Sequence, residues 1–220
     1  MKNKIQPGDI YSLKIDENFY IFLRVLLSIN MQCIEKKLID KTSRLFVFKD
    51  CELIEIYKEY SSTPETDIES LKETIAPTIY CSFAGLLSNE DWSLISSKKV
   101  DLTEVNPPEF VVSNGPFKAS FEKGEVSVPF DFAMDKVRSL DVLPKTYPGN
   151  SLKMFYAANA GVKHDFKFIP DQLKWCKAER YSLEISEEKK EIYRQVSLTQ
   201  PINYLQLSKQ FGKDLSRFYD

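Results

Sequence analysis

The side chains that carry most enzyme chemistry are few in this sequence, and their spacing does not suit that chemistry. The 220 residues contain one histidine, His164, which is followed directly by Asp165. Neighbours in a strand point to opposite faces, so this pair lacks the geometry of a catalytic triad. A nucleophile such as Ser151 would also have to lie nearby, and nothing in the sequence argues for that. We therefore interpret His164 as a surface or loop histidine.

The cysteines give no sign of a metal site. No two of them have CxxC spacing, and one histidine leaves a zinc site short of ligands. We therefore expect no metal and no cofactor. The start MKNKIQPGD lacks an apolar signal-peptide core, and the apolar run 19–29 is interrupted by Arg24 and too short to span a bilayer. These features predict a cytoplasmic protein without membrane association, whose cysteines are reduced and buried: Cys33, Cys51, Cys81 and Cys176.

Carboxylates are numerous, in NED (89–91), DCE (50–52) and ETDIE (65–69). A hydrolase of the glycosidase type needs two of them brought together by the fold, one with a raised pKa. Polar-turn acids are more often simply solvated. GxGxxG and GxxxxGK[ST] patterns are absent, so the usual phosphate-cradling loops are missing. We expect a protein that is not an enzyme and keep a carboxylate-dependent hydrolase as the third hypothesis.

The charges are nearly balanced, with 30 basic and 32 acidic residues and a net charge of −2. Binding to nucleic acid through phosphates needs clustered Lys and Arg, and the chain has no long basic block. We expect no direct binding of nucleic acid.

Short strands dominate the N-terminal half. Tyr11, Leu13 and Ile15 alternate with polar residues, as in a half-buried strand, and 16–18 is a turn. The apolar run that follows is typical of a central strand covered on both faces. Further strands are predicted at 19–27, 32–39, 44–50, 53–57, 78–87 and 92–100. Short strands with short turns predict a bent, mainly antiparallel sheet or a partial barrel.

The C-terminal half mixes one hairpin with helices. Residues 117–130 alternate around a two-residue turn at Lys123-Gly124. Helical spacing recurs at 133–140, after Ser186, and in the C-terminal stripe Leu207, Phe211, Leu215 and Phe218. Residues 61–74 fit a short helix or a linker equally well. We predict an α+β fold in one compact domain (1–220), with a β-rich core at 5–115 and a hairpin plus helical extension at 116–220.

Two segments resemble a known family. The first is GDIYSLKIDENFYIFLRVL, whose matching positions are Gly8, Asp9, Ile10, Leu13, Tyr20, Arg24, Val25 and Leu26. The second is DWSLISSKKVDLTEVNPPEF, matched at Trp92, Ile95, Pro108 and Phe110. In this order they resemble the immunity protein 26 family of bacterial polymorphic-toxin systems. The sequence departs from the family pattern at Leu23 and Ser96, where glycine is usual, and residues 116–220 have no counterpart.

The resemblance implies a non-catalytic cytoplasmic protein that binds a cognate toxin domain and occludes its active site. Many such toxins are nucleases with basic surfaces, so an acidic patch is expected. The matched positions are interpreted mostly as scaffold, with Trp92 covering the end of its own sheet, and the toxin-binding residues are unknown. Arg24 must find a partner or reach the surface. The alternative function is a general β-barrel module that binds a protein or nucleic acid, which an exposed aromatic strip flanked by Lys and Arg would favour.

Overall fold

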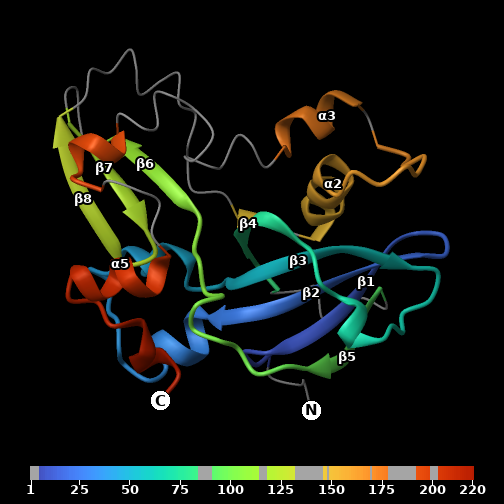
Figure 1. Cartoon of the computed structure of the whole chain (residues 1–220), viewed down its shortest axis with the longest axis horizontal. Coiled ribbons are helices and arrows are strands. Elements are labelled where there is room, and N and C mark those ends of the chain that lie inside the picture. Colours follow the sequence, from blue (N-terminus) through green and yellow to red (C-terminus); the bar gives the residue numbers. More distant parts are fainter. Residues whose placement is uncertain are drawn as a thin grey trace.

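The computed structural model describes residues 5–83, 91–113, 118–131, 146–147, 149–168, 170–177, 192–198 and 203–220 (Figure 1). The chain has an α+β fold with two sheets and no closed barrel among these residues. The larger sheet has the order β5-β1-β2-β3-β4-β9, and its strands are Trp92–Ser97, Asp9–Asp16, Phe19–Ser28, Glu52–Ser61, Thr74–Cys81 and Thr146–Tyr147. The smaller sheet has the order β6-β7-β8, with strands Glu109–Ser113, Lys118–Lys123 and Val126–Asp131.

The larger sheet is bent and mainly antiparallel, as predicted. Among the described strands, the short β4–β9 pair alone is parallel. The register shifts within the β1–β2, β1–β5, β2–β3 and β3–β4 pairs, and such bulges bend strands and increase their twist. Strand β2 is buried on both faces apart from Tyr20, which confirms the central strand. Strand β1 follows the predicted half-buried pattern from Leu13 onward, where Leu13 and Ile15 are buried and Lys14 and Asp16 are partly exposed. Its first half is buried on both faces, since Ser12 is only 1% exposed.

One face of the larger sheet and the ends of its central strands pack on different parts of the molecule. Helix α2 (Gly149–Asn159) covers one face and buries Leu152, Phe155 and Tyr156 against Leu23, Val25, Ile54 and other apolar side chains of the sheet. Helix α3 (Pro170–Trp175) lies beside α2 (Figure 1). A second core joins the ends of β2 and β3 to the smaller sheet, to α5 (Tyr204–Gln210) and to the 3₁₀ turn η6 (Leu215–Phe218). The C-terminal segment therefore docks on the body of the protein.

Two predicted strands are helical turns instead. Residues 32–39 overlap η1, a single π-helical turn over Ile29–Ile34. Its Gln32 side chain accepts from Ser28 N at 2.8 Å and donates to the Phe218 carbonyl at 3.0 Å. Residues 44–50 form the 3₁₀ helix η2 (Arg44–Phe48). It buries Leu45 and Phe48, three residues apart, so the apolar run follows a helical period and not a strand period.

The hairpin at 117–130 is confirmed, with its turn one residue later than expected. Lys123 pairs with Val126, so Gly124 and Glu125 form the turn. Gly124 has φ +58°, and a Cβ there would lie 2.4 Å from the Tyr204 ring. This close approach requires glycine.

The remaining helix predictions have mixed outcomes. The C-terminal stripe does not form one helix, because α5 ends at Gln210 and Gly212 has φ +67° before η6 begins. Leu207, Leu215 and Phe218 are nevertheless buried. Residues 61–74 contain only the 3₁₀ turn η3 (Ile68–Ser70). The predictions at 133–140 and at Ser186 lie outside the described residues. None of the helices in the described part of the chain has the length and apolar character needed to cross a bilayer.

Candidate functional site

Gly8 and Asp9 lie at the point where β1 begins. The Gly8 N–H donates to the Val25 carbonyl at 2.7 Å, and the Gly8 carbonyl accepts from the Lys98 N–H at 2.9 Å. A Cβ on Gly8 would lie 2.5 Å from the Lys98 carbonyl oxygen, and its φ is +94°, so only glycine fits. The Asp9 carboxylate accepts from the Gln6 N–H at 2.8 Å and holds the preceding turn. Both residues shape the backbone.

The positions matched in the second segment lie in the cores. Trp92 packs edge-on against Tyr11, with ring centroids 6.4 Å apart, and is 9% exposed. Pro108 is buried just before β6. Phe110 stacks with Phe48 at 5.9 Å between centroids, within the core that joins the two sheets. These three residues support the scaffold.

Arg24 differs from the other family-pattern positions because it is a buried charge at the edge of a cavity. It is 1% exposed and lies directly across from Glu55 in the β2–β3 register. Its Nε is 2.7 Å from Glu55 Oε1, and its Nη2 is 2.8 Å from Glu104 Oε2. The Tyr57 hydroxyl donates to Glu55 Oε1 at 3.0 Å. Arg24 Nη1 has no hydrogen-bond partner among the described residues.

The electrostatics of this cluster follow from its burial. Burial raises the pKa of Glu55, and the Arg24 guanidinium opposes that rise. Burial acts against the positive charge of Arg24, but the carboxylate of Glu55 and other neighbours together raise the pKa of the guanidinium above its usual value. Arg24 thus stays ionised and neutralises one of its two acidic partners.

A cavity of about 380 Å³ opens beside the cluster. Glu55 and Glu104 line it together with Lys72, Lys98 and Asn106. Both lysines are exposed and form no ion pair within the described residues. The side-chain oxygen of Asn106 is buried and has no hydrogen-bond partner in the part of the chain that the structure describes. We call this space the Arg24 cavity.

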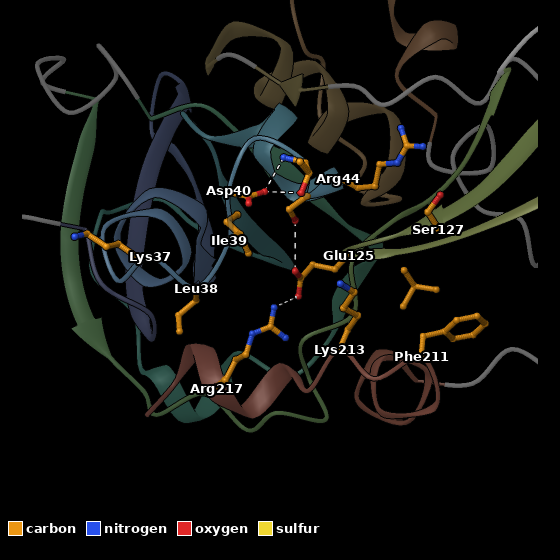
Figure 2. A pocket seen from close by; sticks show the side chains of 13 residues that line it. Lys37, Leu38, Ile39, Asp40, Arg44, Glu125, Ser127, Phe211, Lys213 and Arg217 are labelled. Carbon is orange, nitrogen blue, oxygen red and sulfur yellow. Dashed lines mark hydrogen bonds and ion pairs between the residues drawn. The ribbon is translucent and has the colours of Figure 1, made fainter.

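A second cavity, of about 550 Å³, lies between the 37–44 segment, the β7–β8 turn and the C-terminal residues (Figure 2). Glu125 projects into it and pairs with Arg217 at 2.6 Å, as Figure 2 shows. Three more basic residues and one aromatic ring line this basic cavity: Lys37, Arg44, Lys213 and Phe211. Phe211 is 40% exposed and Arg44 also pairs with Glu122 at 3.1 Å.

The residues considered for catalysis occupy structural positions. His164 lies in an exposed loop, where its Nε2 is 3.2 Å from Asp16 Oδ2 and its ring packs on Phe19. All four cysteines are buried, as predicted. Burial raises the pKa of the Cys33 and Cys51 thiols to about 12, so neither is a ready nucleophile.

The acids of the three segments 50–52, 89–91 and 65–69 lie in different environments. Burial raises the pKa of Glu52 to about 7, and its Oε2 has no hydrogen-bond partner among the residues that the structure describes. Asp91 pairs with Lys153 at 3.3 Å. The 65–69 acids are solvated at the surface. No group of three or more His, Cys, Asp or Glu side chains is placed to hold a metal in the part of the chain that the structure describes.

Sequence reasoning missed Glu55 and Glu104, the two partners of Arg24. Glu55 carried a signal, because it interrupts the apolar strand LIEIY as Arg24 interrupts its own strand. Opposite charges in neighbouring buried strands form a favourable cross-strand pair. Glu104 carried no such signal, since it lies in a polar turn. The pair satisfies part of the hydrolase criterion, two acids in one cavity, but both carboxylates are held on the same guanidinium.

Comparisons with known proteins give no relative. No family model matches the chain, and neither a curated protein nor a solved structure matches it.

Proposed function

We propose that this chain is a non-catalytic cytoplasmic protein that binds a cognate toxin domain and neutralises it by stoichiometric occlusion. One observation carries the proposal. The two segments that resemble the immunity family are neighbours in space, because β1 pairs with β2 on one side and with β5 on the other. Gly8 contacts Val25 of β2 and Lys98, just after β5, through its backbone. The matched positions on β1, β2 and β5 therefore form one structural unit, whereas Pro108 and Phe110 lie at β6 of the smaller sheet.

The use of the reactive side chains also supports a binding role. His164 Nε2 lies 3.2 Å from Asp16 Oδ2 at the surface, burial raises the pKa of the Cys33 and Cys51 thiols, and Glu55 and Glu104 share Arg24. Each group is engaged in stabilising the fold rather than being poised near an open reaction centre.

The connection between β3 and β4 supplies the acidic surface that a basic toxin would need. Glu65, Asp67, Glu69 and Glu73 are all exposed there. Asp67 accepts from the Glu69 N–H at 3.1 Å and so orders the turn. Clustered negative charge accelerates association with a basic partner and makes the rate depend on salt. We propose this acidic connection as a toxin-contacting surface.

Co-expression with the toxin domain encoded next to this gene tests the function. Growth should be rescued, and gel filtration should show a one-to-one complex. Absence of both rescue and complex would refute the proposal. The double variant Glu65→Lys/Glu69→Lys should slow association several-fold at low salt. Asp50→Lys/Glu17→Lys makes the same charge change at exposed positions elsewhere and should leave the rate nearly unchanged.

The basic cavity supports a second candidate function, an interaction module for single-stranded nucleic acid or an acidic peptide. Four basic side chains, two acids (Asp40 and Glu125) and the exposed ring of Phe211 line this one cavity, so cations for phosphate contacts and a stacking surface occur together. Fluorescence anisotropy with a labelled oligonucleotide tests it. Binding that weakens with salt and with Lys37→Ala/Lys213→Ala would favour a nucleic-acid ligand, and no binding at about 50 mM salt would exclude nucleic acid and leave the acidic peptide, which a labelled poly-glutamate peptide tests in the same assay.

A further inference from the structure

The Arg24 cavity combines a buried cation with an unused donor. Arginine presents five N–H groups, and Glu55 and Glu104 lie against Nε and Nη2. Nη1 therefore retains its N–H groups without a partner among the described residues. A buried donor left unpaired is unfavourable, so the fold retains this group at a cost in stability. Such a cost is typical of a site that completes its hydrogen bonds with a ligand.

The charges of the cavity determine which ligand fits. Arg24, Lys72 and Lys98 bring three positive charges, and Glu55 and Glu104 bring two negative charges, which leaves a net charge of +1. A single negative charge balances this sum. A carboxylate has one charge and two oxygens in a plane, which match the planar donors of a guanidinium.

The other residues that line the cavity indicate which groups the rest of the ligand carries. The unpartnered Asn106 side-chain oxygen requires a donor, such as an N–H next to the carboxylate. Tyr57, Leu71 and Ile75 add an apolar wall. A volume of about 380 Å³ lies in the range of small-molecule sites.

We propose that the Arg24 cavity is a binding site for a carboxylate that carries a neighbouring N–H and a short apolar group. Free N-acylated amino acids and the C-terminal residue of a peptide both have this chemistry. The inference rests on the cavity alone and not on toxin neutralisation.

Glu104 already occupies one nitrogen of the guanidinium, Nη2. Its side chain is 36% exposed and lies on the turn at 101–104, where its Oε2 also accepts from the Asp101 N–H at 3.0 Å. Nη1 itself is shielded from water. Glu104 pairs with Nη2, so a ligand carboxylate that uses this nitrogen as well as Nη1 has to displace Glu104, and the two carboxylates compete for Arg24.

Calorimetry with N-acetylleucine and N-acetylleucinamide at low salt tests the site. The acid should bind, and the amide, which lacks the charge, should bind at least tenfold more weakly. Glu104→Ala should tighten binding of the acid by removing its competitor. Equal binding of acid and amide, or no binding of the acid to either protein, would overturn the proposal.

Lysine variants test the charge count without disturbing Arg24. The double variant Lys72→Ala/Lys98→Ala should weaken binding of N-acetylleucine severalfold. Lys99→Ala, which changes an exposed neighbour outside the cavity, should leave this affinity unchanged. The backbone bonds of Lys72 and Lys98 remain in these variants. An equal loss of affinity in Lys72→Ala/Lys98→Ala and in Lys99→Ala would contradict the proposal. A peptide ending in leucine distinguishes the two sources, because tighter binding than N-acetylleucine indicates a chain terminus.

Discussion

Replacing Arg24 by methionine should destabilise the protein more than any exposed charge change. Methionine fills a similar volume but leaves Glu55, which is 8% exposed, with only the Tyr57 hydroxyl as a partner. Breaking a buried ion pair by removing one partner costs about 3–5 kcal/mol. In a chain of this size that loss lowers Tm by about 6–20 °C. Glu104 contributes little to the penalty, because its side chain can turn to water.

The penalty depends on pH with a definite sign. Burial raises the pKa of Glu55 and Arg24 lowers it, so losing the guanidinium raises the folded-state pKa further. A group with a raised folded-state pKa contributes stability below its unfolded pKa, and this stability is lost as pH rises through the folded value. The difference between wild type and Arg24→Met should therefore be smallest near about pH 4 and grow toward neutral pH.

Urea unfolding at several pH values measures this difference. The double variant Arg24→Met/Glu55→Gln should recover most of the loss, since the amide keeps an acceptor for Tyr57 without a charge. Lys58→Met removes one side of an exposed ion pair with Glu73 and should cost at most about 1 kcal/mol. The reasoning is refuted if Arg24→Met and the double variant lose the same stability at every pH.

Three further predictions concern other buried features. Gly124→Ala should lower the free energy of unfolding by about 1–2 kcal/mol because of its positive φ and by about 1–3 kcal/mol more because its Cβ would clash with Tyr204. Gly212→Ala also has a positive φ but open space around it, so only the first cost applies. Equal losses of the two variants in urea unfolding would exclude the clash. Glu52, whose pKa of about 7 is raised by burial, favours folding at low pH, so Glu52→Gln should stabilise the protein at pH 8 by roughly 2–4 kcal/mol and change little near pH 4. Cys33 and Cys51 should resist a thiol reagent at pH 8 until urea unfolds the chain, and rapid labelling of native protein would contradict their burial.

Sequence periodicity predicted the parts of the fold whose pattern is local. The β1–β2 hairpin and the β7–β8 hairpin were located correctly, because alternation and turn residues lie within a few positions of each other. The predicted strand at 44–50 failed because RLFVF has no turn signal that separates a strand from a 3₁₀ helix. Tertiary packing of Leu45 and Phe48 decided the outcome.

The division of the chain into 5–115 and 116–220 remains a prediction. The smaller sheet takes β6 from the first part and β7 and β8 from the second. The core that contains Phe110 also contains Phe121 and Phe218. A sequence boundary drawn from loss of family resemblance marks where the pattern ends, which is a different property from where packing ends.

The candidate site was half visible in the sequence, and the reason is physical. A charged residue inside an apolar strand can be noticed in the sequence, because a buried charge is unfavourable unless it is paired. Arg24 and Glu55 each interrupt an apolar run in this way. Their pairing follows once β2 and β3 are neighbours in register. Glu104 comes from a turn 80 residues along the chain from Arg24, and no local pattern reports its position. The scaffold positions Gly8 and Trp92 can therefore be recognised from sequence, whereas the ligand chemistry of the cavity depends on long-range packing that only the fold supplies.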